Sequence, residues 1–216
     1  MSSVIAVVDY GMGNLRSVSK ALEHVVEDGQ RVIVSSDAGE IADAERVVFP
    51  GQGAARDCMQ QLKDLKLDEV VLHAAHEKPF LGICMGMQVL MSHSEENQGI
   101  DCMGLYAGDV RAFSDEKLSA QMQSLKIPHM GWNEVAHKRM HPLWSDIKEN
   151  SRFYFVHSYY VDPEDKALVA GTTEYGIEFV SAIARDNVFA VQFHPEKSAY
   201  DGLQLLKNFS AWNGKV

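Results

Sequence analysis

The 216-residue sequence lacks several features that would assign it to a familiar class of protein. It has only three cysteines, Cys58, Cys84 and Cys102, and no C-x-x-C pair, which argues against a disulfide framework and against a thiolate metal cage. No apolar run approaches the length of a membrane span, and the opening residues lack the basic start and long apolar centre of a signal peptide. We therefore expect a cytoplasmic protein that contacts no membrane.

Positive charge is also scarce. The chain carries 20 Lys and Arg against 30 Asp and Glu, and its only compact basic cluster is "HKRMH" at 137–141. A nucleic-acid groove needs a basic stripe, so we expect no nucleic-acid partner. The histidine pairs His73-x-x-His76 and His137-x-x-x-His141 have no carboxylate or cysteine at convincing ligand spacing. We accordingly expect no metal site.

Internal repeats, low-complexity tracts and Pro/Ser-rich linkers are absent as well. What the chain does have is ordinary for a globular protein, with 46% hydrophobic and 23% charged residues. A chain of this length can bury a substantial core without disulfides or metals. The sequence therefore predicts one domain over residues 1–216.

The first half of the chain alternates between short apolar runs and helical patterns. Helical spacing or composition marks the segments 15–26, 55–64, 67–77 and 85–94. Strands buried on both faces are predicted at 4–9, 31–36, 46–50 and 79–84. Strands that alternate with helices are typical of a parallel sheet with helices on its faces.

The second half is rich in strand patterns instead. Predicted strands lie within 109–113, 127–135, 151–162, 167–175, 178–186 and 188–196. Short turns join many of them, which indicates antiparallel pairing. A last helix is predicted at 198–212, where Ser198 and Asp201 resemble a capping box. The fold class predicted is thus α/β, an open, mostly parallel sheet flanked by helices with added antiparallel strands.

One cysteine occupies an unusual setting, in Gly82-Ile83-Cys84-Met85-Gly86. A nucleophile on a sharp strand-to-helix turn needs small residues two before and two after it, because side chains there would collide. The first turn of the helix would favour the Cys84 thiolate, and the Met85 N–H would be placed to stabilise an oxyanion. The pattern is short, so a buried core thiol remains an alternative.

A base for such a thiol is available in "FHPE". The apolar run 188–193 ends at His194-Pro195-Glu196, and residues i and i+2 of an extended segment project to one side. His194 could then act as the base with Glu196 as its orienting group. The alternative is a strand end that carries ordinary polar residues.

A second oxyanion donor is suggested by Pro50-Gly51-Gln52-Gly53, which follows the predicted strand 46–50. The glycines would let a backbone N–H turn toward a reacting carbonyl, although a plain turn is the commoner meaning of Pro-Gly. Three strand ends would bring these groups together at the carboxyl edge of a parallel sheet, where such folds hold their sites.

With these residues identified, the sequence resembles the class I, triad-type glutamine amidotransferases, whose fold is flavodoxin-like. The segments "FPGQG", "GICMGMQ" and "FHPEKS" carry this resemblance. Further segments resemble the branch of the family that supplies the glutaminase subunit of imidazole glycerol phosphate synthase: "VVDYGMGNLRSV", "PHMGWN" and "FVHSYY". The resemblance runs nearly from end to end.

The resemblance implies a reaction and a set of roles. Cys84 would attack the side-chain amide of glutamine, and His194, oriented by Glu196, would protonate ammonia and then activate water. The oxyanion would be held by the backbone of Gly51, Gln52 and Met85. Residues implied to contact the glutamine are Gln88, Glu96, Ser158 and Tyr159. No cofactor is implied.

The resemblance also implies a partner, a (β/α)8-barrel cyclase that uses the ammonia in histidine biosynthesis and forms a heterodimer with this chain. Trp132 in "GWN" would lie at the interface, and a core tryptophan beside a tight turn is the alternative. Relatives often carry Leu at Met85 and a small apolar residue at Gln52. Because backbone groups act at both positions, the triad assignment does not depend on these side chains.

Other functions remain open. Gly11-Met12-Gly13 after the first strand suggests a nucleotide-binding loop, but Arg16 stands where the dinucleotide fingerprint needs a glycine, and Asn14 as a helix cap accounts for the loop. An amidotransferase subunit for anthranilate, aminodeoxychorismate or pyridoxal phosphate synthesis would share the triad without "DYGMGNLRSV" or "PHMGWN". A non-catalytic binding protein with the same fold is a third alternative.

Overall fold

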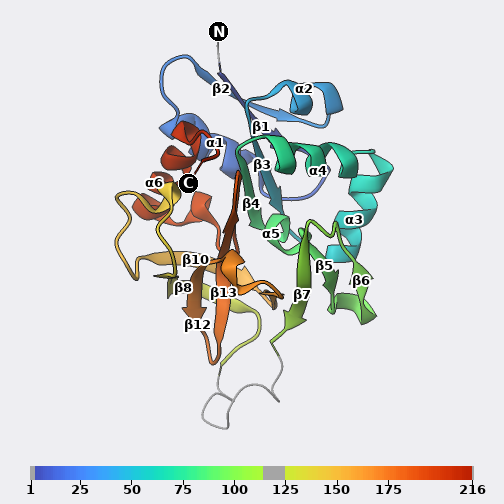
Figure 1. Ribbon diagram of the computed structural model, residues 1–216, viewed down its shortest axis with the longest axis vertical. Helices are drawn as coiled ribbons and strands as arrows, with labels where there is room; N and C mark the ends of the chain where they lie inside the picture. The colour runs from blue at the N-terminus through green and yellow to red at the C-terminus, as the bar shows by residue number, and fades with distance from the viewer. Residues whose placement is uncertain (1–2, 114–124, 216) are drawn as a thin grey trace.

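The apolar runs of the first half form the parallel part of a large sheet in the computed structural model, which describes residues 3–113 and 125–215 (Figure 1). Neighbouring strands follow the order β2-β1-β3-β4-β14, and every pair in this series is parallel. Their bounds are β1 Ser3–Val8, β2 Gln30–Ser35, β3 Arg46–Gly51, β4 Phe80–Cys84 and β14 Val188–Val191. The carboxyl ends of β3, β4 and β14 therefore meet at one edge.

Antiparallel strands extend this sheet beyond β14, in the order β13-β11-β7, and β5 and β6 continue it. β5 pairs parallel with β7, whereas β12 pairs antiparallel with β13 and with β9. The bounds are β5 Met91–Ser94, β6 Ile100–Asp101, β7 Tyr106–Ala112, β9 Ala136–His137, β11 Tyr159–Pro163, β12 Val169–Glu174 and β13 Glu178–Arg185. The predicted fold class is confirmed.

A separate two-stranded antiparallel sheet is formed by β8 (His129–Glu134) and β10 (Arg152–His157). Its side chains alternate between buried and more exposed positions along both strands. His129 of β8 and Phe153, Phe155 and His157 of β10 are buried, and Met130 and Trp132 lie on the exposed face. This small sheet brings β10 beside the end of β14, where the His194 N–H donates to the Tyr154 carbonyl.

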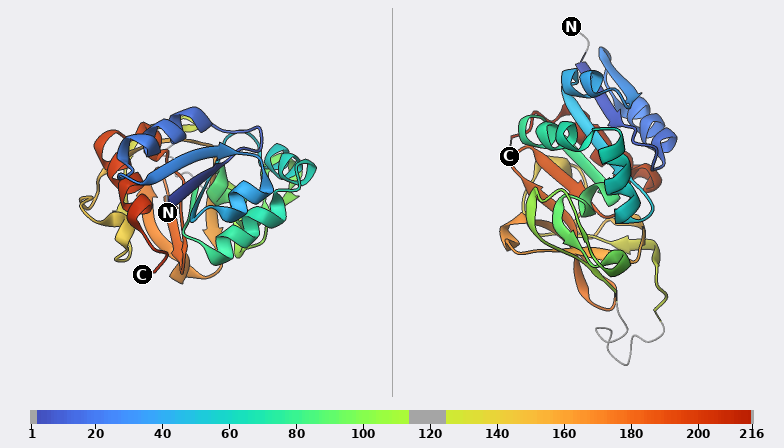
Figure 2. Two further views of the ribbon diagram at one scale, coloured as in Figure 1. Left: turned by 90° about the horizontal axis from the view of Figure 1, so that it is seen from above. Right: turned by 90° about the vertical axis from the view of Figure 1, so that its right-hand side faces the viewer.

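Two apolar cores lie on opposite faces of the main sheet. Helices cover both of these faces (Figures 1 and 2). In β1, Ala6 and Val8 join one core while Ile5 and Val7 join the other, so a continuous apolar run serves both faces. Helices α2, α3 and α4 pack in the first core, and α1 and α6 pack in the second. Helix bounds are α1 Leu15–Val25, α2 Ala38–Asp43, α3 Ala55–Asp64, α4 Asp68–Glu77, α5 Met85–Gln88 and α6 Ala199–Ala211.

The helix predicted at 85–94 is wrong in its extent. α5 ends at Gln88, and Met91–Ser94 forms β5. Met91 pairs with Tyr106 of β7, and the whole segment 85–91 is buried. Tertiary pairing with a strand distant in sequence therefore outweighs the local helical composition.

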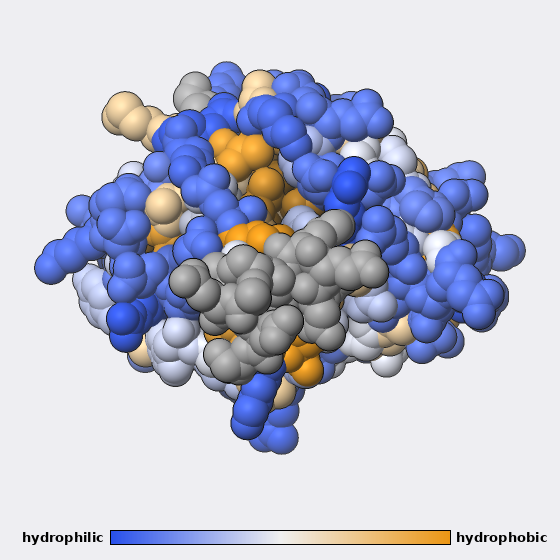
Figure 3. All heavy atoms as spheres, turned by 90° about the horizontal axis from the view of Figure 1, so that it is seen from below, coloured by the Kyte–Doolittle hydropathy of each residue, from blue (hydrophilic) through white to orange (hydrophobic). Residues whose placement is uncertain are grey.

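The surface is mostly hydrophilic in the view from below, where apolar atoms show in a recess near the middle of this face (Figure 3). Large apolar side chains with substantial exposure in the described residues are Val34, Leu65, Ile127, Met130, Trp132, Met140 and Tyr200. Within 3–113 and 125–215, no helix combines the length and apolar composition needed to cross a membrane.

Candidate active site

Cys84 sits on a strained turn between β4 and α5. Its backbone has φ 55° and ψ −107°, a conformation rare for a residue with a side chain. A Cβ at Gly86 would lie 1.9 Å from the Phe49 carbonyl oxygen, and one at Gly82 would lie 2.8 Å from the Gly86 oxygen. The two glycines are thus required by contact with backbone, as the steric argument from the sequence predicts.

His194 and Glu196 meet beside this turn. The Nδ1 of His194 lies 2.9 Å from Oε1 of Glu196, and the two side chains are only 2% and 1% exposed. The expected extended geometry is wrong: His194 is extended, but Pro195–Lys197 forms a 3₁₀ turn. The turn still brings the carboxylate to the imidazole.

The backbone of His194 is anchored to β10 through one hydroxyl. Ser198 Oγ donates to the His194 carbonyl at 2.6 Å and accepts from the Tyr154 N–H at 2.9 Å. The capping box predicted with Asp201 is therefore absent, since Ser198 occupies the N-cap of α6 without a side-chain cap bond. Its hydroxyl fixes the histidine loop instead.

The electrostatics of the site act on His194. Burial disfavours the charged imidazole, but the neighbouring Cys84 and Glu196 outweigh it and raise the pKa of His194 to about 10. Its Nε2 is buried and has no hydrogen-bond partner within the described part of the chain. Nε2 is thus the atom available to exchange a proton with the Cys84 sulfur, while Nδ1 is occupied by Glu196.

The expected oxyanion segment lies directly beside the cysteine. Gly51, the last residue of β3, is the register partner of Cys84 in the parallel ladder. A Cβ at Gly51 would meet the Tyr10 hydroxyl at 2.3 Å and the Met85 Cβ at 2.7 Å, so only glycine fits there. Met85 is the first residue of α5, where a helix leaves its N–H without an intrahelical partner.

A cavity of about 410 Å³ joins most of the predicted residues. Cys84, His194 and Met85 contribute to its wall, and the other predicted residues that line it are Gln52, Gln88, Glu96, Ser158 and Tyr159. Glu196 lies behind His194, and Gly51 lies behind Met85. The structure therefore brings the predicted triad, oxyanion and substrate residues to one hollow.

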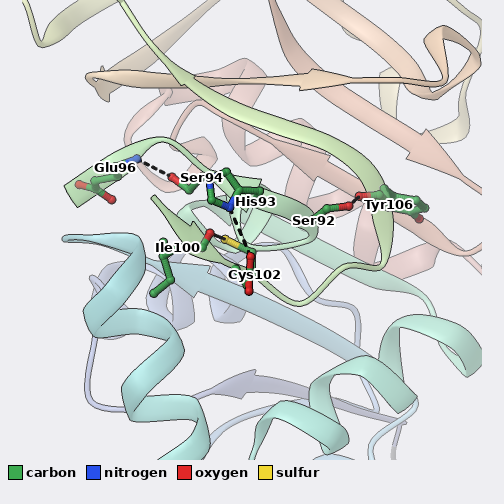
Figure 4. Close-up of polar contacts among 8 residues, drawn as sticks. Ser92, His93, Ser94, Glu96, Ile100, Cys102 and Tyr106 are labelled. Atoms are coloured by element: carbon green, nitrogen blue, oxygen red, sulfur yellow. Dashed lines mark hydrogen bonds and ion pairs between the residues drawn. The ribbon is translucent and has the colours of Figure 1, made fainter. Parts of the chain in front are cut away.

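Glu96 is held at the cavity from two sides. Its N–H bonds to the Ser94 hydroxyl at 3.2 Å, and its carboxylate points away from His93 and Cys102 (Figure 4). Oε2 accepts from the Ala55 N–H at 2.6 Å, so this carboxylate caps helix α3, whose own N-cap residue has no suitable side chain. A carboxylate that lines the cavity suits the ammonium group of an amino acid.

Gln192 is a residue that the sequence reasoning missed. It is fully buried, and its Nε2 lies 3.6 Å from the Cys84 sulfur while its Oε1 accepts from Gln88 Nε2 at 3.0 Å. The signal was present, because Gln192 is the one polar side chain in the apolar run 188–193 and lies two residues before His194.

Two alternatives from the sequence can be compared with the structure. Trp132 is 50% exposed, which excludes a core tryptophan. Asn14 stands at the N-cap of α1 but makes no side-chain cap bond, so the expected cap is wrong. Gly13 instead packs near Gly51, where its Cβ would lie 3.6 Å from the Gly51 Cα. The glycine loop thus abuts the oxyanion segment.

A larger hollow, of about 710 Å³, lies away from these groups around residues 137–145. It contains the basic cluster noted in the sequence, and His137 contacts Glu149 there at 3.4 Å. Among the described residues no group of three or more His, Cys, Asp and Glu side chains is placed to hold a metal ion. The smaller cavity, with its thiol and imidazole, is the candidate active site.

Comparison with known proteins identifies a family and a group of similar proteins. A sequence model of the class-I glutamine amidotransferase family matches residues 6–211. The chain is 61% identical over 209 residues to the imidazole glycerol phosphate synthase subunit HisH of Dechloromonas aromatica strain RCB, with 96% of each chain covered. It is 58% identical over 214 residues to the protein of that name from Nitrosococcus oceani, with 99% of each covered.

Solved structures share the fold at lower identity. The structure of PurLQS from Thermotoga maritima matches with a TM-score of 0.69 and 21% identity, over 97% of this chain and 98% of that one. A crystal structure of a glutamine amidotransferase, also from Thermotoga maritima, matches with a TM-score of 0.57 and 17% identity, over 91% and 77%. These two likenesses concern the fold alone.

Proposed function

The chain belongs to the class-I glutamine amidotransferase family, and from this premise we propose that it is the glutaminase subunit of an imidazole glycerol phosphate synthase in histidine biosynthesis. It hydrolyses L-glutamine to glutamate and ammonia. The single observation that carries the proposal is the buried Cys84, His194 and Glu196 arrangement at the end of β4. The names of relatives above 50% identity support the pathway.

The proposed first step is attack by the Cys84 thiolate on the carboxamide carbon of glutamine. A carbon–sulfur bond forms, and the carbonyl oxygen becomes an oxyanion. The imidazolium of His194 then gives its Nε2 proton to the nitrogen, the carbon–nitrogen bond breaks, and ammonia leaves a thioester. The raised pKa of His194, about 10, keeps this proton available at neutral pH.

In the second step His194 removes a proton from water, which attacks the thioester and releases glutamate. Glu196 keeps the imidazole oriented through Nδ1 in both steps. We assign the oxyanion to the Met85 N–H and to the backbone of Gly51 and Gln52, because Gly51 is the register partner of Cys84.

Substrate contacts are assigned to residues of the same cavity. The Glu96 carboxylate would bind the ammonium group of glutamine. One of its oxygens already caps α3, and the other would accept from the ammonium group. Ser158 and Tyr159 line the wall. Gln88 would use its carbonyl oxygen, because its Nε2 donates to the Tyr159 carbonyl and to Gln192.

We propose a cyclase subunit with a (β/α)8 barrel as the partner that consumes the ammonia. The exposed face of the β8/β10 sheet, formed by Met130, Trp132, Tyr154 and Val156, is our candidate for the contact. Val156 also lines the cavity with Cys84, so this face adjoins the place where ammonia is made.

The test measures glutamate release by the purified chain, alone and with its cognate cyclase and the cyclase's nucleotide substrate. We expect weak release alone, stimulation in the complex, and loss of at least a hundredfold in Cys84→Ala. Cys58→Ala is the matched control and should retain activity if it folds. Undiminished release by Cys84→Ala would refute the glutaminase mechanism, and full activity without a partner would refute only the coupling.

A further inference from the structure

A chain of buried hydrogen bonds ends at the Cys84 sulfur, and the mechanism above gives its last member, Gln192, no role. Gln192 lies at its end, with Nε2 3.6 Å from the sulfur. Gln88 precedes it and bonds to Gln192 and to the Tyr159 carbonyl. Gln192 is fully buried and Gln88 is 3% exposed, so water cannot substitute freely for these bonds.

The direction of these bonds is fixed by chemistry. A backbone carbonyl only accepts, so the Gln88 atom 3.1 Å from the Tyr159 oxygen must be the amide nitrogen. That nitrogen has two hydrogens, and its second neighbour must also be an acceptor, which makes it Oε1 of Gln192 at 3.0 Å. The remaining atom of the Gln192 amide is therefore its NH₂ group, which faces Cys84.

A histidine pair holds the same carbonyl from the other side. His157 Nδ1 lies 2.8 Å from the Tyr159 oxygen and must donate, so its Nε2 accepts from His129 Nδ1 at 2.9 Å. His129 Nε2 then accepts from Asn133 Nδ2 at 3.2 Å. Burial lowers the pKa of His157 to about 3 and that of His129 to about 4, which keeps both rings neutral as this pattern requires.

We propose that Gln192 is a positioning residue for the nucleophile: its amide N–H, oriented by Gln88 and by the His157–His129 pair, donates to the Cys84 sulfur and favours the thiolate. A donor to sulfur stabilises the anion more than the neutral thiol. Cys58 shows the opposite setting, because burial raises the pKa of its thiol to about 12. The proposal deepens the glutaminase function, on which its purpose rests.

The experiment measures how fast iodoacetamide alkylates Cys84 in the full chain as a function of pH, with peptide mass spectrometry to separate Cys84 from Cys58 and Cys102. Gln192→Met keeps the shape of the side chain and removes the donor. We expect the pH midpoint of alkylation to rise by about one unit, which is about a tenfold slower reaction below the midpoint. Gln204→Met, on α6, is the matched control and should keep the parent midpoint.

Gln192→Asn is the second variant, and it tests the role of the Gln192 amide if Gln192→Met does not fold. It keeps the amide but withdraws it by one methylene, so the midpoint should again rise. An unchanged midpoint in a folded variant overturns the proposal. Because alkylation needs no turnover, a parent that releases no glutamate would overturn the proposed function while a shifted midpoint still supported the role of Gln192.

Discussion

At the scale of single residues, the environment distinguishes three thiols that are chemically identical in the sequence. Burial raises the pKa of Cys58 to about 12 and, together with Asp101 and Glu96, that of Cys102 to about 11. Cys84 instead lies against His194 and the Gln192 amide. A thiol is reactive only as the thiolate, so we expect alkylation near neutral pH to select Cys84.

Gln52 supplies a prediction at this scale. Its side chain lines the cavity, and its backbone belongs to the proposed oxyanion segment. In Gln52→Val the β-branched side chain favours extended backbone, so turning the N–H toward the substrate should cost more. We expect partner-stimulated glutamate release to fall several-fold, measured against the exposed control Gln60→Val. Unchanged basal and stimulated rates of glutamate release in Gln52→Val would contradict a role of this side chain in turning the oxyanion segment.

His141 gives a pH prediction. It is 6% exposed, and burial together with the nearby Arg139 lowers its pKa to about 4. The unfolded chain, with an ordinary histidine pKa near 6.5, binds more protons between those values, so stability falls as pH drops from about 6.5 toward 4. This residue alone should lower the free energy of unfolding by about 2 kcal/mol as the pH falls from 7 to 5.

The variant His141→Asn tests this origin. Nδ1 of His141 accepts from the Leu143 N–H at 3.1 Å, and Asn can keep that cap. Urea unfolding at pH 7 and pH 5 should show a smaller difference in free energy for the variant than for the parent. The exposed His73→Asn on α4 serves as control, with the parent's difference retained. An equal pH dependence in His141→Asn would contradict the assignment.

The role of a single residue could be predicted from the sequence where its neighbours in the chain determine that role. Cys84 was identifiable because glycines at both flanks have a steric reason that the structure shows at Gly86 and Gly82. Gln192 could be noticed as the one polar side chain in an apolar run, but its role could not be assigned, since that role depends on Gln88, 104 residues away. The roles of the predicted triad, oxyanion and substrate residues remain predictions, although one cavity gathers them.

At the scale of elements, the turn between β4 and α5 is the critical connection. A Cβ at Gly86 would lie 1.9 Å from the Phe49 oxygen of β3, and backbone cannot move aside cheaply. We expect Gly86→Ala to lower the free energy of unfolding by about 3 kcal/mol or more and to remove glutamate release, as measured by urea unfolding and activity.

Gly39→Ala is the matched control for that change. Gly39 lies in α2, where a new Cβ would meet only the Asp37 carboxylate, at 3.1 Å. Alanine also favours helix more than glycine does, so stability should change little or rise slightly. A Gly86→Ala protein as stable and active as this control would contradict the steric account of the turn.

Elements were predictable from sequence where burial on both faces leaves a continuous apolar run, as in β1, β3 and β4. The error over 85–94 has a physical cause. Its apolar composition fits a buried helix as well as a buried strand, and only the pairing of Met91 with Tyr106 of β7 decides between them. The predicted Ser198 cap is also wrong because of a tertiary contact, since the Ser198 hydroxyl accepts a hydrogen bond from the Tyr154 N–H of β10.

At the scale of the whole molecule, Trp132 tests the proposed partner face. It is half exposed on β8 beside Tyr154, with ring centroids 6.2 Å apart. A large aromatic at the centre of an interface commonly contributes about 2 kcal/mol or more, so Trp132→Ala should weaken cyclase binding by about thirtyfold in calorimetry. Leu65→Ala, at the end of α3, should bind like the parent. Equal affinity in both variants would exclude this face.

The two cores bear on whether residues 1–216 form one domain, which we propose. Leu62 of α3 lies in one core, while Leu206 of α6 and the buried Trp144 and Trp212 lie in the other. Both cores share β1, β3, β4 and β14, whose alternate side chains enter opposite faces. Losing either core should therefore unfold the shared sheet and with it the other core.

Leu62→Ala makes this measurable, since the fluorescence of the buried Trp144 and Trp212 reports the core that the substitution does not touch. The void that the substitution leaves in the core should lower the free energy of unfolding by about 2 to 5 kcal/mol. The urea midpoints measured by fluorescence and by far-ultraviolet circular dichroism should fall together. Leu206→Ala, which acts on the tryptophan core directly, should shift both midpoints in the same way. If Leu62→Ala lowered the dichroism midpoint and left the fluorescence midpoint at the parent value, the two cores would be separate cooperative units. Only an independent core could keep its tryptophans buried while the helices on the other face unfold.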